Sequence, residues 1–513
     1  MPLIKLDIPA GIYSHGSDLD SKGRWLDSNF VRWTNNSPEP VGGWVNLEDS
    51  GTFVQINTAI TGLFRGSHAW TTNGNAPYMA LGSYNSLYLL TGTNALVDIT
   101  PTGLTPGQQD AGQNLGYGGG VYGDQSYGVP RQSNYTISAA TTWTLSNFGQ
   151  NLIACSDADG NIYELIMDDG QGGGFLNDQT VNATIIPNAP TANESIIVTA
   201  ERFVFALGSR GNNGSPRLIR WSDRENSNQW TPAVTNQAGD LELQTTGEIV
   251  CAKNVRGRTI ILTTDDAWVA NYQGPPLVYG FQKVGDSCGV VGKSMAAAVG
   301  ASAIWMGERN FFVYDGSTVR VLQCDVHDKV FTEMSTSRMS HGFCVSNQKF
   351  NEVWWFYPGD GDNENTRYVA YDYNEGHWLV GALSRTAGVD SGSFDAPLYI
   401  DEDGYIYRHE TGYTHAGVKP FIESGPINLG EGDNVVKVSE FIPEEDTIGE
   451  MAISFKAKFY PNDVERVYGP YDPSNPTNVR FTGRQFKVLI EGDDTVNWRF
   501  GDVRLRVENG GRR

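Results

Sequence analysis

The chain alternates short apolar runs with polar turns, and each run resumes with aromatic residues directly after the turn. Such alternation around a Gly, Asp or Asn turn predicts a β-hairpin. The clearest cases are 76–90 (APYMALGSYNSLYLL), 151–165, 258–272, 301–316 and 396–408. The later hairpins recur at roughly 45 to 50 residues, the spacing of four-stranded propeller blades. The pattern therefore predicts a mostly β protein built on a β-propeller of six or seven blades.

The same pattern divides the chain into three segments. Residues 1–58 are predicted to be an N-terminal β-hairpin segment, because apolar positions alternate around a Pro/Gly turn within 23–44. Residues 59–412 are predicted to be the propeller, interrupted at about 101–137 by an exposed Gly/Tyr-rich loop. Residues 413–513 are predicted to be a separate β-rich module, because the hairpin pattern breaks after His415. The insertion and the N-terminal hairpin blur the register, so six and seven blades both fit.

Composition supports a globular chain and limits its partners. The 513 residues are 39% hydrophobic and include 13 Trp and 23 Tyr, which is enough for a large β core. The formal net charge is −22, so the surface should repel a phosphate backbone, which excludes an ordinary DNA-binding protein. The acidity suits solubility alone, or a conduit through which DNA slides without sticking.

Cysteine usage and the chain start indicate folding in a cytoplasm. The five cysteines are widely spaced without a C-x-x-C pair, so neither a disulfide framework nor a zinc site is predicted. The N-terminus lacks the apolar stretch of a signal peptide, and the sequence has no run of 18 apolar residues. We therefore expect no membrane anchor.

Several motifs imitate catalytic signatures. Gly285 to Gly289 (GDSCG) satisfies G-x-S-x-G, but that elbow needs a strand-to-helix turn, and here hairpins flank a turn with a buried cysteine. Gly118 to Gly123 matches G-x-G-x-x-G without the strand and helix that would hold a pyrophosphate. Gly292 to Ser294 resembles the end of a phosphate loop and His409-Glu410 the start of a zinc-protease motif. Both lack a required residue, since Ser287 and Tyr413 stand at the missing positions.

Acidic turns and aromatic strands have both a structural and a functional interpretation. The turns 157–161, 360–363 and 401–404 resemble fragments of calcium loops, but none continues to a Glu at the twelfth position, and Asp and Asn are ordinary turn residues. The aromatic runs 305–314 and 354–357 suit blade packing better than a sugar-binding platform. A catalytic carboxylate pair, as in propeller glycosidases, stays an open alternative. The sequence assigns no catalytic, cofactor-binding or metal-binding residue, and we predict that the chain is not an enzyme.

A set of phrases recurs in the same order in a family of bacteriophage virion proteins. They are Arg32-Trp33, 38–44 (PEPVGGW), Trp221-Ser222-Asp223, Asn228-Gln229-Trp230, Cys288-Gly289, Trp305-Met306-Gly307, 311–316 (FFVYDG), 482–485 (TGRQ), 498–501 (WRFG), Arg504-Leu505 and 510–513 (GGRR). On these residues the chain resembles the tail nozzle (tail tubular protein B-like) or head-to-tail stabilisation proteins of short-tailed phages. The likeness spans nearly the whole chain and contains no catalytic signature.

The resemblance implies a function in the virion. It implies a propeller subunit of a homo-oligomeric, hexameric ring below the portal and adaptor proteins, made in the host cytoplasm. Such a ring would extend the DNA channel, retain the packaged genome and carry tail fibre or needle proteins. Double-stranded DNA would pass through its lumen without sequence-specific binding. The alternative from another class is a carbohydrate-binding or carbohydrate-active β-propeller.

Overall fold

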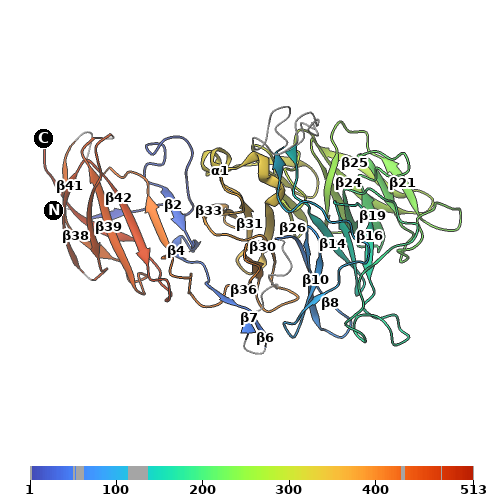
Figure 1. Ribbon diagram of the computed structural model, residues 1–513. Coiled ribbons are helices and arrows are strands. Elements are labelled where there is room, and N and C mark those ends of the chain that lie inside the picture. Colours follow the sequence, from blue (N-terminus) through green and yellow to red (C-terminus); the bar gives the residue numbers. More distant parts are fainter. Residues whose placement is uncertain are drawn as a thin grey trace, which may run out of the picture.

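A computed structural model describes residues 3–49, 52–53, 63–113, 137–428, 434–460, 462–474 and 476–511. These residues form a β-propeller and a β-sandwich that lie side by side, and both chain ends lie on the sandwich (Figure 1). The prediction of a mostly β protein with a propeller and an additional C-terminal β module is confirmed. No helix within the described ranges is long and apolar enough to cross a membrane.

Within the described residues, seven four-stranded antiparallel sheets form the propeller, so of the six or seven blades that the sequence left open the structure has seven. Blades one to three are β8 (Phe64–Thr71), β9 (Pro77–Ser83), β10 (Leu87–Thr91) and β11 (Leu96–Asp98); β14 (Trp143–Phe148), β15 (Asn151–Ser156), β16 (Ile162–Leu165) and β17 (Thr184–Ile185); and β18 (Ser195–Val198), β19 (Val204–Leu207), β20 (Leu218–Trp221) and β21 (Gly239–Glu242). Blades four and five are β22 (Ile249–Val255), β23 (Arg258–Thr263), β24 (Ala267–Gly274) and β25 (Val278–Gly285); and β26 (Ala296–Val299), β27 (Ser302–Met306), β28 (Phe311–Tyr314) and β29 (Val319–Leu322). Blade six is β30 (Phe343–Asn347), β31 (Glu352–Tyr357), β32 (Arg367–Asp372) and β33 (His377–Ala382).

The seventh blade closes the ring with a strand from the start of the chain. It consists of β34 (Ala387–Val389), β35 (Leu398–Ile400), β36 (Ile406–His409) and β5 (Trp44–Asn46). β5 pairs antiparallel with β36, Trp44 opposite His409. The first strands β8, β14, β18, β22, β26, β30 and β34 contact one another in that circular order, so they surround the propeller axis.

Burial along each blade explains the apolar runs in the sequence. Middle strands such as β10 and β15 are buried along nearly their whole length, because neighbouring blades cover both faces of the sheet. Outer strands such as β21 are largely exposed and polar. The turns between middle strands are tight, and Gly160 shows why: its φ is +62° and an added Cβ would lie 2.5 Å from the backbone of Ala192.

Two sheets form the sandwich, and both recruit strands from the N-terminus. One contains β1 (Leu3–Leu6), β43 (Val503–Asn509), β38 (Val436–Pro443) and β41 (Thr477–Gly483), in that order. The other contains β2 (Trp25–Asn29), β37 (Phe421–Ser424), β42 (Gln485–Gly492), β39 (Met451–Lys458) and β40 (Arg466–Tyr471). Aromatic rings fill the space between them, with Phe455 and Phe481 stacked at 4.8 Å. The segment 1–58 is thus shared between the sandwich and the propeller.

The hairpin of β3 (Val31–Thr34) and β4 (Ser37–Pro40) lies where the two domains meet. The backbone N–H of Phe500 donates to the carbonyl of Pro38 at 3.1 Å, and Arg499 pairs with Glu39 at 2.9 Å. On its propeller side the hairpin inserts Arg32 between Glu352 and Glu410, with closest N–O distances of 2.8 and 2.6 Å. We call these three residues the Arg32 cluster.

The remaining elements are short. They are β6 (Glu48–Asp49), β7 (Thr52–Phe53), β12 (Gly112–Gln113), β13 (Ile137–Ser138), the helix α1 (His327–Glu333) and the 3-10 turns η1 (Thr336–His341) and η2 (Gln348–Phe350). Residues 116–128 of the predicted Gly/Tyr loop, and with them the Gly118 to Gly123 motif, lie outside the described residues.

Candidate functional site

An axial cavity of about 250 Å³ lies where the first strands of the blades converge. Six of those seven strands, β8, β14, β18, β22, β30 and β34, contribute lining residues. A second cavity of about 450 Å³ adjoins it and shares Ser67, His68, Lys253 and Cys344 with it. The two cavities therefore form successive sections along the propeller axis, and the shared residues mark the place where they meet.

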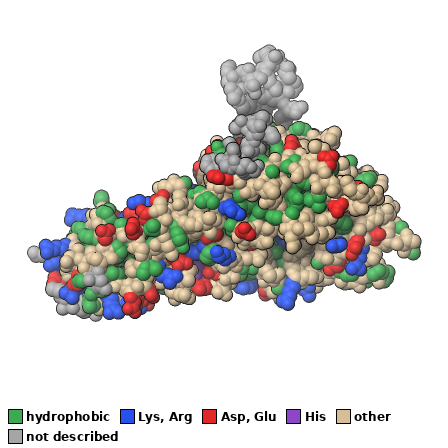
Figure 2. All heavy atoms as spheres, turned by 90° about the horizontal axis from the view of Figure 1, so that it is seen from below, with side chains coloured by type: hydrophobic (Ala, Val, Ile, Leu, Met, Phe, Trp, Pro, Cys, Tyr) green, Lys and Arg blue, Asp and Glu red, His purple; other side chains and the backbone are tan. Residues whose placement is uncertain are grey.

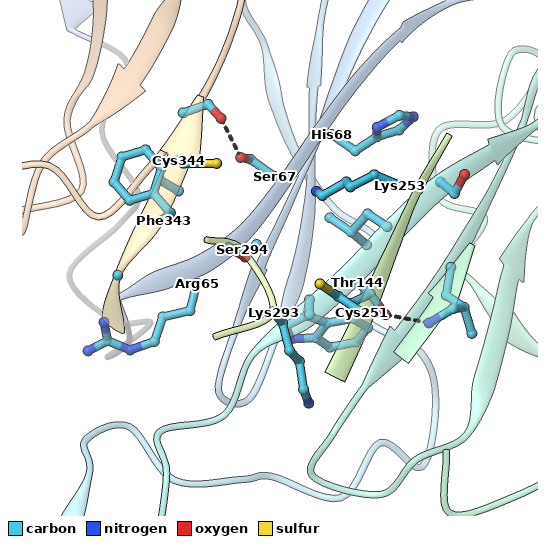
Figure 3. A pocket seen from close by; sticks show the side chains of 18 of the residues that line it. Arg65, Ser67, His68, Thr144, Cys251, Lys253, Lys293, Ser294, Phe343 and Cys344 are labelled. Carbon is cyan, nitrogen blue, oxygen red and sulfur yellow. Dashed lines mark hydrogen bonds between the residues drawn. The ribbon is translucent and has the colours of Figure 1, made fainter. Parts of the chain in front are cut away.

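Basic side chains dominate the charge of the first cavity. Its lining includes Arg65, Lys253 and Lys293, together with His68 and His341. In Figure 3 the Lys253 side chain extends toward Ser67 and Cys344, whereas Lys293 and Arg65 point away from them. The described residues that line this cavity include no Asp or Glu, although the protein has a net charge of −22.

Two of these cations are already neutralised. Lys293 Nζ lies 2.7 Å from Asp157 Oδ2 and 2.8 Å from Glu194 Oε1. Arg65 lies 2.8 Å from Glu364. For Lys253, in contrast, no carboxylate within ion-pair distance occurs in the described part of the chain. The Lys253 ammonium is therefore the charge that a ligand of the cavity would meet.

The neighbouring titratable groups are neutral. Burial, together with the charge of Lys253, lowers the pKa of His68 to about 4, and the His68 Nε2 lies 3.1 Å from the Asn147 carbonyl oxygen. Burial raises the pKa of the Cys251 thiol to about 11 and that of Cys344 to about 12. These cysteines stay protonated at neutral pH and are poor nucleophiles.

The G-x-S-x-G motif is a turn between β25 and β26, as the sequence predicted. Ser287 is exposed with a φ of +52°, and the next element is β26, not a helix. Cys288 is buried, and its backbone N–H donates to the carbonyl of Asp265 at 2.8 Å. Among the described residues, no histidine is hydrogen-bonded to Ser287, so this serine is part of a structural turn.

Carboxylates in the three acidic turns accept hydrogen bonds from hydroxyl groups a few residues further along the chain. Asp159 accepts from the Tyr163 hydroxyl at 2.6 Å, and Asp401 accepts from the Tyr407 hydroxyl at 2.8 Å. Asp362 accepts from the Thr366 hydroxyl. Asp157 is the exception, because its carboxylate reaches Lys293 at the cavity wall.

The two other near-miss motifs and the aromatic runs are parts of the buried frame. His409 is buried and accepts from Arg385 Nε at 3.1 Å, while Glu410 belongs to the Arg32 cluster. Lys293 and Ser294 line the cavity. The aromatic residues of both runs are buried in blade cores: Trp305, Phe311, Phe312, Tyr314, Trp354, Trp355, Phe356 and Tyr357. They pack the blades and do not form an exposed sugar platform.

Sequence reasoning missed Lys253 and the Lys293 ion pairs. Lys293 and Asp157 are 136 residues apart, and no local pattern links them. Lys253 lies in an ordinary strand pattern, and only its place in the first strand of a blade distinguishes it.

No protein-family model matches the chain, and no curated protein matches it. Several solved structures are similar to it in shape. An exo-β-1,3-galactanase from Phanerochaete chrysosporium in complex with β-1,3-galactotriose has a TM-score of 0.28 and 10% identity, covering 91% of this chain and 100% of its own. An arabinoxylan arabinofuranohydrolase of glycoside hydrolase family 43 from Bacillus subtilis has a TM-score of 0.25 and 11% identity, covering 88% and 97%. The AfRom2 CNH domain has a TM-score of 0.28 and 9% identity, covering 51% and 91%.

These neighbours correct one prediction. Two of the three are glycoside hydrolases, which contradicts the sequence-based prediction that the chain is not an enzyme. The physical reason is that a propeller gathers side chains from distant blades at its axis, so a missing linear motif says little about catalysis. At these TM-scores the likeness assigns no residue of this chain to a reaction.

Proposed function

We propose that the chain is a structural subunit of a short bacteriophage tail, repeated in a hexameric ring around the tail axis. The observation that carries this proposal is the location of residues on which the sequence resemblance depends. Arg32 ties the hairpin to the propeller, Trp305 is buried in blade five, and Trp498 is buried in the sandwich. These residues therefore stabilise the propeller, the sandwich and the N-terminal hairpin that lies between them, which is consistent with a structural ring subunit.

In the proposed ring, the DNA path would run between the subunits and not through the axis of a propeller, because the axial cavity is small. The cavity has a volume of about 250 Å³. A DNA duplex is much wider than such a cavity, since its major groove alone is about 12 Å wide. On the face in Figure 2, Lys and Arg side chains are interspersed with Asp and Glu over both domains. Together with a net charge of −22, this distribution favours a lumen wall that lets DNA slide.

The edge strand β40 supports assembly with neighbouring subunits. A ring requires two different complementary faces on each subunit. β40 ends its sheet, and apolar side chains on and beside it are exposed: Tyr460 by 56%, Val464 by 89% and Val467 by 63%. An edge strand with exposed apolar side chains is a natural site for pairing with another chain.

The test is negative-stain imaging with mass determination of the purified chain, alone and with the other tail proteins. We expect rings, or recruitment into a multi-ring tail. The double variant Val464→Asp, Val467→Asp should reduce assembly, while Val321→Asp on the outer strand β29, 55% exposed, is the matched control. A chain that stays monomeric and never joins tail particles would contradict the proposal.

A carbohydrate-binding or carbohydrate-active propeller is the second candidate. The observation that favours it is the axial cavity, whose polar lining around Lys253 and Ser67 suits a small polar ligand. It predicts glycan binding or cleavage by the isolated monomer, weakened at least about tenfold by Lys253→Met. Unchanged binding in Lys253→Met would mean that the ligand does not bind in the axial cavity. A monomer that neither binds nor cleaves a glycan but assembles into tails would contradict the carbohydrate proposal and support the ring proposal.

A further inference from the structure

Two histidines and an aspartate meet where the N-terminal segment crosses the propeller. His15 lies between β1 and β2, and His327 and Asp328 begin α1. Within the described ranges, these three form the group of His, Cys, Asp or Glu side chains whose ligand atoms all lie within 4.8 Å of one another. We call them the His15 cluster.

The backbone holds the cluster in place. The N–H of Gly16 donates to Asp328 Oδ2 at 2.8 Å, and the N–H of Ser14 donates to the carbonyl of Asp325 at 2.8 Å. Two residues before Ser14, the N–H of Ile12 donates to the carbonyl of Trp378 at 2.9 Å. Three hydrogen bonds within five residues fix the position of the segment around His15 relative to α1 and the neighbouring part of the propeller.

His327 faces oxygen acceptors with both ring nitrogens. Its Nε2 lies 2.7 Å from the Arg309 carbonyl oxygen, and its Nδ1 lies 3.0 Å from Asp328 Oδ1. A neutral imidazole carries one N–H, and the carbonyl oxygen can only accept, so Nε2 must hold that proton. The Nδ1 then faces a carboxylate oxygen at hydrogen-bond distance, a contact that is favourable when a second proton or a metal cation lies between the two atoms.

The distances suit a metal ion. Zinc binds histidine nitrogen and carboxylate oxygen at about 2.0–2.1 Å, which sets tetrahedral ligand atoms about 3.3 Å apart. His15 Nδ1 lies 3.3 Å from Asp328 Oδ2, and His327 Nδ1 lies 3.0 Å from Asp328 Oδ1, so each histidine faces one oxygen of the same carboxylate. The hydrogen bond from His327 Nε2 to a backbone carbonyl is the usual outer contact of a metal-binding histidine.

We propose that His15, His327 and Asp328 bind a divalent transition-metal ion, best fitted by zinc, that fastens the N-terminal segment to the propeller. The side chains are 53%, 33% and 45% exposed, so the ion has access from solvent and keeps a coordination position for water. The inference is independent of the proposed function, because ring assembly and glycan binding use other surfaces.

The test is calorimetric titration of the chelator-treated full chain with zinc chloride, followed by the visible spectrum of the cobalt(II) form. We expect one ion per chain and a tetrahedral cobalt spectrum. His15→Ala and His327→Ala should each weaken binding at least about 100-fold, the upper end of what losing an outer contact alone costs. His377→Ala is the matched control, because His377 pairs with Glu375 at 2.9 Å outside such a group.

Three outcomes would overturn the proposal. They are no zinc binding by the wild-type chain, unchanged binding in both cluster variants, or an equal loss in His377→Ala. Circular dichroism of the metal-free variants checks folding. His15 lies in an exposed segment, so His15→Ala keeps the test decisive if His327→Ala fails to fold.

Discussion

Two charged clusters fasten the N-terminal segment to the propeller, and they do so in opposite ways. The Arg32 cluster is enclosed, with side-chain exposures of 4%, 3% and 8% for Arg32, Glu352 and Glu410. The His15 cluster is exposed to solvent. In the first, every charge finds its partner within the protein. In the second, the Nδ1 of His327 lies 3.0 Å from a carboxylate oxygen of Asp328, and a proton or a metal ion there satisfies both atoms.

The hydrogen bonds of the Arg32 cluster show how complete its pairing is. Arg32 donates from Nε and Nη2 to both oxygens of Glu352, and from Nη1 and Nη2 to both oxygens of Glu410. Trp354 Nε1 adds a donor to Glu352, and Asn347 adds one to Glu410. A cluster satisfied from within has a structural role, whereas an incompletely satisfied one at the surface has room for a ligand.

Breaking the enclosed cluster should have the largest effect. Arg32→Ala leaves two buried carboxylates without their cation, and we expect a loss of about 3–5 kcal/mol in the free energy of unfolding. Urea denaturation measures it. Arg217→Ala is the control, since Arg217 pairs with Glu242 at 3.1 Å on the surface and should cost less than about 1 kcal/mol. Equal losses in the two variants would mean that burial of the Arg32 cluster has no energetic consequence.

Adding zinc should stabilise the chain through the other cluster. At about 100 times its dissociation constant, zinc bound only to the folded state adds about 2.7 kcal/mol to the free energy of unfolding. We expect this gain in the wild-type chain and in Arg32→Ala alike, within about 0.5 kcal/mol, because the two clusters share no residue. Denaturation with zinc and with chelator measures it. A gain that disappears in Arg32→Ala would show that the clusters are coupled.

The comparison also explains what the sequence could and could not predict. Hairpins are local, so the alternation within 151–165 predicts strands that pair as β15 and β16. Ring closure depends on Trp44 pairing with His409, and no local pattern encodes that contact. The same is true of the Arg32 cluster, because Arg32 is separated along the chain from Glu352 by 320 positions and from Glu410 by 378. His15 and His327 lack a metal-motif spacing for the same reason. What the sequence missed was therefore created by long-range contacts: the return of the N-terminus to the propeller, and the meeting of Lys293 with Asp157 from another blade.

Removing His15 from the His15 cluster in the absence of metal should have a small effect on the free energy of unfolding. In chelator, His15→Ala loses an exposed contact to Asp328 at 3.3 Å and an edge contact with the His327 ring, and we expect a change of about 0–1 kcal/mol. Thermal unfolding in chelator checks this. A loss comparable to that of Arg32→Ala would make the His15 cluster a structural joint in its own right and remove the contrast between the two clusters.

The smallest effect concerns acid stability. Hydrogen bonds from His327 and from the backbone N–H of Gly16 lower the pKa of Asp328 below its ordinary value of 3.8. The folded state then binds fewer protons than the unfolded state in this range, so the contribution of Asp328 is present above pH 3.8 and is lost as the pH falls through the folded pKa. In chelator, the stability difference between the wild-type chain and Asp328→Asn should narrow as the pH drops below about 4. A difference that stays constant in urea denaturation from pH 5 to 3 would mean that the carboxylate is not held by these hydrogen bonds, and the preformed geometry of the His15 cluster would lose its support.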